Sequence, residues 1–93
     1  MKKEIGIVIK AMRLRLGYKQ EYVAHKINIS ASLLGHIENG RVGLDIDKLY
    51  LLANFYNVLS RNILEITIEL YKNKTNNGLD NAINHIMQKE VKL

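Results

Sequence analysis

The sequence contains no cysteine, no proline and no tryptophan, and it has a single phenylalanine among its 93 residues. The lack of cysteine excludes disulfide bridges, thiol chemistry and zinc knuckles, so a packed core must stabilise the chain alone. No run of about 18 apolar residues occurs, so we expect no transmembrane helix and no membrane partner. These limits favour one small cytoplasmic domain with a single core.

Residues that could carry catalysis or bind a metal are few and scattered. His25, His36 and His85 do not have the spacing of metal ligands. Asp45 and Asp47 are placed like the acids that begin a helix rather than like a catalytic pair. No glycine-rich phosphate loop and no nucleophile motif occurs. We therefore expect no enzyme activity, no metal, no cofactor and no small-molecule ligand.

Positive charge is concentrated in the first half of the chain. The net charge is +5, from 14 Lys and Arg against nine Asp and Glu. Residues 1–41 carry eight of the basic residues and three of the acids, whereas residues 42–93 carry six of each sign. A basic half of this kind indicates either a polyanionic partner such as nucleic acid or a solvated basic face, and charge alone leaves both open.

Apolar residues recur with the 3.6-residue period of amphipathic helices, and no long stretch alternates as a strand does. Because proline is also absent, this pattern predicts an all-α fold. Five helices are expected, over residues 4–16, 19–26, 31–39, 46–56 and 60–71. The apolar face of the first is formed by Ile5, Ile9, Met12 and Leu16.

Local signals mark the ends of these helices. Ser30 and Asp45 are expected N-caps, and Gly17 and Gly40 are expected helix stops. The link between the second and third helices is too short for a wide loop, so one of its residues must turn sharply with a positive φ. Asn28 is among the few residues other than glycine that tolerate this conformation, which predicts a tight helix-turn-helix.

The composition changes after residue 71. The stretch "KNKTNNG", residues 72–78, reads as a polar linker. Apolar residues then repeat at helical spacing and predict a C-terminal amphipathic helix of about three turns. Residues 1–71 are therefore expected to form one domain, and residues 72–93 a linker and a dimerisation helix.

The last two expected helices carry more apolar residues than one small core readily buries. This excess predicts a two-fold homodimer interface. Whether the last helix crosses to the partner or packs on its own chain stays open. The expected interface residues are Ile63, Ile66, Leu70, Ile83, Ile86, Met87 and Val91.

An ordered set of residues runs through the first two-thirds of the chain. It consists of Gly6, Arg13, Gly17, Gln20, Val23, Ala24, Ile29, Ser30, Leu34, the run "IENG" at residues 37–40, Leu49, Leu52, Ala53 and Val58. With this order and spacing, residues 5–64 resemble the phage-repressor and Cro type (XRE-like) of DNA-binding helix-turn-helix domain. Two positions depart from that family's pattern, because Asn28 replaces the commoner glycine and Gly43-Leu44 stands where many members carry proline.

The resemblance implies a five-helix, lambda-repressor-like fold followed by the C-terminal helix. In this family the second helix of the motif enters the major groove of DNA. The resemblance also pairs Arg13 with Glu38, which follows the core residue Ile37 directly. The alternative for Glu38 is an exposed position at the end of its helix.

Two sets of DNA-contacting residues follow from the same resemblance. The base-reading positions are Ala31, Ser32, Leu33 and His36. The phosphate-binding positions are Lys19, Gln20, Ser30, Asn39 and Arg41. No base-reading position holds an Arg or Gln that could bind a base in a bidentate way, so we expect DNA shape and flanking contacts to supply much of the specificity. Gly35 in the same helix either allows close approach to a phosphate strand or marks an indifferent surface site.

The sequence thus predicts a transcriptional regulator that binds double-stranded DNA sequence-specifically, as a homodimer on a palindromic operator. A prophage or mobile-element repressor, a restriction–modification controller protein and an antitoxin all fit its size. The alternative is a protein-interaction module, antitoxin-like or antirepressor-like, that keeps the fold with weak or no DNA binding.

Overall fold

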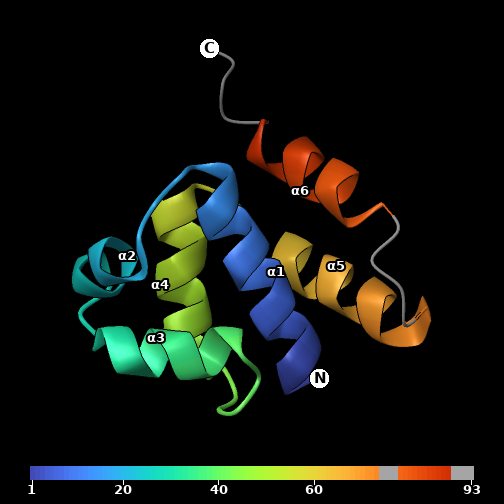
Figure 1. The fold of residues 1–93 in the computed structure, drawn as a ribbon. Coiled ribbons are helices and arrows are strands. Elements are labelled where there is room, and N and C mark those ends of the chain that lie inside the picture. The colour runs from blue at the N-terminus through green and yellow to red at the C-terminus, as the bar shows by residue number, and fades with distance from the viewer. Residues whose placement is uncertain (74–77, 89–93) are drawn as a thin grey trace.

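The computed structural model of the protein describes residues 1–73 and 78–88, and this part of the chain folds into helices only (Figure 1). The helices are α1 (Lys2–Arg15), α2 (Gln20–Lys26), α3 (Ala31–Glu38), α4 (Ile46–Tyr56), α5 (Ser60–Asn73) and α6 (Leu79–Met87). The predicted all-α class is confirmed, and each predicted helix is present with small shifts at its ends. No helix within these ranges has both the length and the apolar character needed to cross a membrane.

The ends of the helices follow the local chemistry of the sequence. The Ser30 hydroxyl accepts a hydrogen bond from the backbone N–H of Leu33 at 3.0 Å, and Asp45 accepts one from the backbone N–H of Lys48 at 2.8 Å. Both side chains satisfy N–H groups that would otherwise lack a partner in the first helical turn. The predicted N-caps of α3 and α4 are therefore confirmed.

The turn between α2 and α3 depends on one left-handed residue. Asn28 has a φ of 63°, as its position in the short link requires. The N–H of Ile29 then donates to the carbonyl of Ala24 at 3.0 Å, which closes the turn on α2. Ile29 is half-buried and packs against the core. The predicted tight helix-turn-helix is confirmed.

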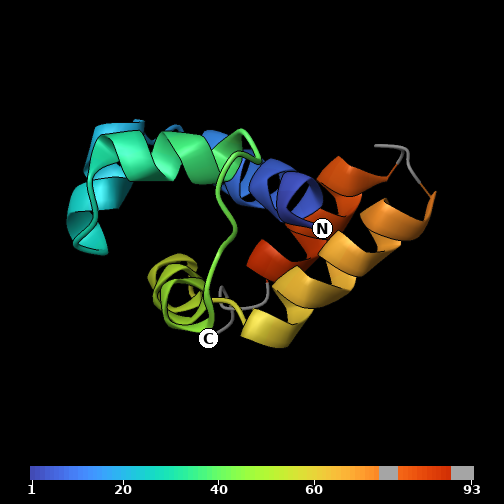
Figure 2. The same cartoon turned by 90° about the horizontal axis from the view of Figure 1, so that it is seen from below.

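Helix α1 crosses the middle of the molecule, with α2 and α3 on one side and α5 and α6 on the other (Figure 2). Its residues Val8, Ile9 and Met12 are completely buried. Leu16 was expected on the same apolar face, but it is 40% exposed. The reason is that α1 ends at Arg15, so Leu16 lies in the turn that leads away from the core.

Helix α6 packs on α1 and α5 of its own chain and completes the same core. Ile83, Ile86 and Met87 are buried there, together with Ile63 and Leu70 of α5. The expectation that one core could not bury these side chains is therefore wrong. Helix α6 packs on its own chain, which answers the question that the sequence left open. Of the other two expected interface residues, Ile66 is half-buried and Val91 lies outside the described residues.

Candidate nucleic-acid interface

A buried ion pair fastens the end of α3 to α1. The Arg13 guanidinium donates from Nε to Glu38 Oε2 at 2.8 Å and from Nη2 to Glu38 Oε1 at 2.9 Å. Its Nη1 donates to the carbonyl of Tyr18 at 2.8 Å, so three of its N–H groups are used. The Glu38 side chain is only 1% exposed, which confirms the predicted bidentate bridge and rules out a solvated Glu38. The hydrogen bonds to Glu38 raise the pKa of Arg13, although burial acts in the opposite direction.

Gln20 joins the same network from the first turn of α2. Its Nε2 donates to Glu38 Oε1 at 2.9 Å, so one carboxylate holds α1, α2 and α3 together. The carboxamide lies over Gly35, where a Cβ atom would come within 3.5 Å of Gln20 Oε1. That distance is ordinary van der Waals contact, so Gly35 is not required for space in the free protein.

Tyr56 of α4 belongs to the surroundings of this ion pair. Burial raises the pKa of its hydroxyl, and the negative charge of Glu38 raises it further. The phenol therefore stays neutral near Glu38 over the physiological pH range, and the buried network keeps its charge balance.

The outward face of α3 is polar. Ser32 and His36 are exposed and stand four residues apart, so they share one face of the helix. Asn39, three residues further on, is exposed and extends the same side. Ala31 and Leu33 are half-buried, which leaves them less surface to offer.

The remaining expected DNA-contacting residues flank this face. Lys19 is exposed and immediately precedes α2, and Ser30 is exposed and caps α3. Arg41 is exposed in the turn after α3, where its N–H donates to the carbonyl of His36 at 2.9 Å. Because Gln20 touches Gly35 and Glu38, the start of α2 lies beside the second half of α3. The surface around α3 thus gathers polar and basic groups from two helix starts and one turn.

A sequence profile of a protein family described as "Helix-turn-helix" matches residues 9–62, more than half of the chain. The chain belongs to this helix-turn-helix family. The match supports the phage-repressor and Cro (XRE) type, so the protein is a DNA-binding transcription regulator in the general sense. Neither the curated proteins nor the solved structures contain a match to it.

Within this helix-turn-helix protein, the matched region contains all of α2 to α4 and the second half of α1. It includes the turn at Asn28 and both members of the Arg13–Glu38 pair. Helix α3 is the second helix of the motif, and α6 lies outside the matched region. Most of α5 also lies beyond it, so the core contains elements that the matched region does not include.

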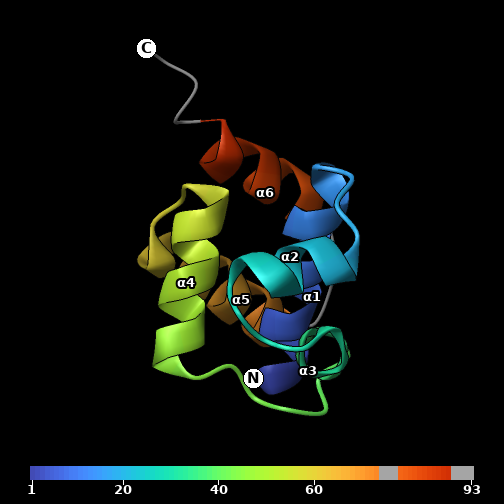
Figure 3. The same ribbon diagram turned by 90° about the vertical axis from the view of Figure 1, so that its left-hand side faces the viewer.

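The helix-turn-helix surface has neighbours that the sequence did not indicate. Figures 1 and 3 both place the end of α3 beside the N-terminal end of α1. A Cβ atom on Gly40 would lie 2.9 Å from Lys3 Cα, and Lys2 Nζ donates to the carbonyl of Arg41 at 3.5 Å. Lys2 and Lys3 therefore stand next to Arg41, although they are about forty residues away along the chain. The sequence indicated Gly40 only as a helix stop and gave no sign of this close approach.

Proposed function

We propose that this protein binds a palindromic operator as a homodimer and regulates transcription there, with α3 lying in the major groove. Ser32 and His36 read base edges, where a hydroxyl and an imidazole can each donate or accept a hydrogen bond. Ala31 and Leu33 offer apolar contact, for example to a thymine methyl group. The observation that carries this proposal is the exposed polar face of α3, held on its support by a buried ion pair and flanked by cations.

The phosphate backbone is held from the flanks of α3 in this proposal. The phosphate-binding groups are Lys19, Gln20, Ser30, Asn39 and Arg41. Glu38 accepts from Gln20 Nε2 and so fixes the direction of the carboxamide, which keeps a second N–H for a phosphate oxygen. The Ser30 hydroxyl already accepts from Leu33, so it retains its own proton to donate.

A pair of variants tests this assignment. Because phosphate contacts position the protein while base contacts specify sequence, Arg41→Ala should weaken binding to operator and to random duplex alike. It should also lower the slope of log affinity against log salt by about 0.9 for each phosphate interaction that the substitution removes. Ser32→Ala with His36→Ala should instead weaken operator binding by about 1–3 kcal/mol for each base interaction removed and leave the salt slope nearly unchanged.

The measurement is a titration of each variant with both duplexes at several salt concentrations. Equal losses of the Ser32/His36 variant on the two duplexes would show that these residues do not read sequence. An unaltered salt slope in Arg41→Ala would remove Arg41 from the phosphate-binding set.

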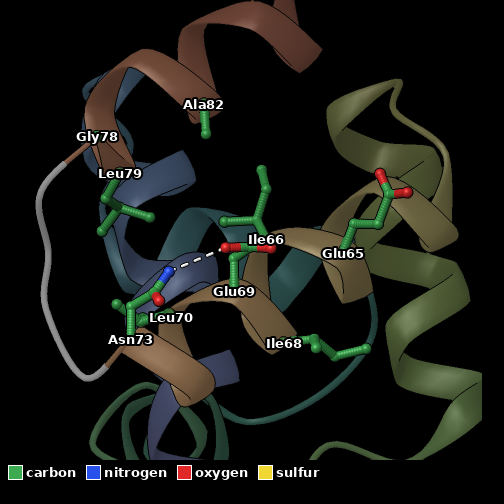
Figure 4. A pocket seen from close by; sticks show the side chains of 9 residues that line it. All are labelled: Glu65, Ile66, Ile68, Glu69, Leu70, Asn73, Gly78, Leu79 and Ala82. Atoms are coloured by element: carbon green, nitrogen blue, oxygen red, sulfur yellow. Dashed lines mark hydrogen bonds between the residues drawn. The ribbon is translucent and has the colours of Figure 1, made fainter.

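The homodimer in this proposal uses the exposed side of α5. Leu64, Ile68 and Tyr71 are 39%, 38% and 46% exposed and follow one another at i, i+4 and i+7, so they form one stripe. A groove between α5 and α6 lies beside this stripe, and Ile66 and Leu79 form part of its wall (Figure 4). A second copy packed on this side would give two recognition helices that can match half-sites about 34–36 Å apart.

The alternative function is a protein-interaction module on the same fold. The outer face of α4 supports it, because Ile46 and Tyr50 are 75% and 60% exposed and are not used by the DNA proposal. The two functions differ in a simple measurement. A protein-interaction module would show no salt-dependent binding to duplex DNA, whereas the regulator would.

A further inference from the structure

A shallow groove runs along the outer side of α1 and ends at α3. We call it the α1 groove. The α1 residues that line it recur at helical spacing, so they lie on one face of that helix. The residues that line it are Lys3, Ile7, Lys10, Ala11 and Leu14 of α1, with Glu38 and Asn39 at the end of α3.

The α1 groove carries uncompensated positive charge. Lys3 and Lys10 are exposed, and among the described residues neither lies within 4.0 Å of an acidic group. Glu38 lines the groove, but its two oxygens accept from Arg13 and Gln20. The only acid of α1 is Glu4, which is not part of the groove. Two exposed ammonium groups in a groove favour a polyanion as their partner.

The α1 groove is continuous with the expected DNA surface. Asn39 belongs to both, because it follows His36 on the outer side of α3 and also lines the groove. At the N-terminal end of α1, the Lys2 ammonium group donates a hydrogen bond to the carbonyl of Arg41. The α1 groove thus meets the expected DNA surface at Asn39, and the N-terminal turn of α1 adjoins the loop that carries Arg41.

Close packing of backbones holds the two surfaces together. A Cβ atom on Gly6 would lie 2.3 Å from the carbonyl oxygen of Ile37, so α1 and α3 touch without side chains between them. Gly40 makes the same kind of approach to Lys3. The backbone of Lys3 therefore has a fixed position relative to α3. A residue that binds the same ligand as α3 needs such a fixed position.

We propose that the α1 groove is a second phosphate-binding site, in which Lys3 and Lys10 hold the DNA backbone beyond the base pairs that α3 faces. This inference rests on the proposed DNA-binding function. Seven residues along a helix separate the two lysines by about 10 Å. Phosphates of one DNA strand are spaced by about 3.4 Å along the helix axis, so two flexible lysines at this distance can reach neighbouring parts of one strand. Ile7, which lies between the lysines in sequence, and Ala11, which follows Lys10, are half-buried and also line the groove.

The test compares three double variants on a mixed-sequence duplex of about 30 base pairs, roughly three helical turns. Lys3→Ala/Lys10→Ala removes the two charges, and Lys3→Arg/Lys10→Arg keeps them. Arg15→Ala/Lys26→Ala is the matched control, because it removes two exposed charges that lie outside both the α1 groove and the α5 stripe. Urea denaturation of each variant establishes that the fold is intact.

We expect Lys3→Ala/Lys10→Ala to lower the slope of log affinity against log salt by about 0.9 for each phosphate interaction removed, or nearly two per protomer. The arginine variant and the Arg15→Ala/Lys26→Ala control should keep the wild-type slope. A wild-type slope in Lys3→Ala/Lys10→Ala, together with a lower slope in Arg41→Ala, overturns the second site and leaves the proposed function standing. Failure of the wild-type protein to bind any duplex overturns both.

Discussion

At the scale of single residues, Glu38 is the acid on which most of the recognition surface depends. Its carboxylate accepts three hydrogen bonds, two from Arg13 and one from Gln20, in a position almost closed to water. Removing one partner of such a pair leaves a buried charge without compensation. Arg13→Met should therefore destabilise the free protein by about 3 kcal/mol, at the lower end of the usual range because Gln20 still donates to Glu38.

The comparison for Arg13→Met is a double variant with an apolar residue at both positions. Arg13→Met with Glu38→Leu removes the charge as well as its partner, so part of the lost stability should return. Urea denaturation measures both. A midpoint that does not change in Arg13→Met would mean that the bridge contributes nothing to folding.

Asp45 gives a prediction about pH. Hydrogen bonds from Lys48, foremost from its ammonium group at 2.7 Å and also from its backbone N–H, lower the pKa of the Asp45 carboxyl. A carboxyl whose folded-state pKa is lowered contributes stability that is complete above the unfolded pKa, near 4, and is lost as pH falls through the folded value. The stability difference between the wild type and Asp45→Asn should therefore shrink as the pH drops below about 4.

The Asp45 measurement is the urea midpoint of both proteins from neutral to acid pH. Asparagine keeps an oxygen that can cap α4, so the comparison isolates the charge. Because Asp45 is exposed, salt should weaken the difference at neutral pH. A difference that stays constant into acid would assign the effect to something other than the Asp45 carboxylate.

At the scale of elements, a change from glycine to alanine should have opposite effects on stability at two helical positions. Gly35→Ala adds a methyl group in ordinary contact with Gln20, so it should stabilise α3 by about 1 kcal/mol. Gly6→Ala adds one that meets backbone atoms of α3 at 2.3 Å, and it should destabilise the protein by about 3 kcal/mol or more.

Thermal unfolding of the two alanine variants tests both signs at once. A stabilising shift in Gly6→Ala would contradict the close packing of α1 on α3, whereas a destabilising shift in Gly35→Ala would contradict the ordinary contact of that position with Gln20. DNA titration of Gly35→Ala adds separate information. Loss of affinity in that variant, with its stability raised, would identify Gly35 as a site of close approach to phosphate.

The helices themselves were largely predictable, because their signals are local. Ser30, Asp45 and Asn28 each act within a few residues of their own position, and each has the predicted role. The Arg13–Glu38 pair came from the family resemblance rather than from spacing. By contrast, the sequence does not show what covers the apolar face of a helix. Periodicity shows that α6 must bury one side, but it does not distinguish its own α1 from a second chain.

The sequence also did not predict which residues far apart in the chain lie close together in the fold. Nothing within the first ten residues indicates that Lys3 lies against Gly40, since the contact depends on how α1 crosses α3. Gln20 was predicted as a phosphate ligand from its place in the family motif. Its hydrogen bond to Glu38 depends on the angle between α2 and α3, which the spacing of residues does not fix.

At the scale of the whole molecule, self-association is expected to depend on α5 but not on α6. Ile68 is partly exposed on the α5 stripe, so Ile68→Glu should keep the fold and give a monomer in sedimentation at micromolar concentration. Tyr50→Glu is the control, because it places the same charge on an exposed apolar position of α4. Ile83 is buried between α6 and the rest of the core, so Ile83→Ala should instead cost about 2–5 kcal/mol of folding stability.

Two outcomes would contradict this account of assembly. A wild-type protein that sediments only as a monomer would remove the homodimer from the proposal. Dissociation by Ile83→Ala without loss of stability would return α6 to the interface between chains.

The packing of α6 on α1 has a consequence for how the protein is made. The side chains of Arg15 and Asn84, which are hydrogen-bonded, are 69 positions apart, so α1 is synthesised well before the helix that packs on it. Synthesis at about 5–20 residues per second gives the nascent chain several seconds in which the side of α1 that packs on α6 is uncovered. Contacts so distant along the chain also slow the search for the native state.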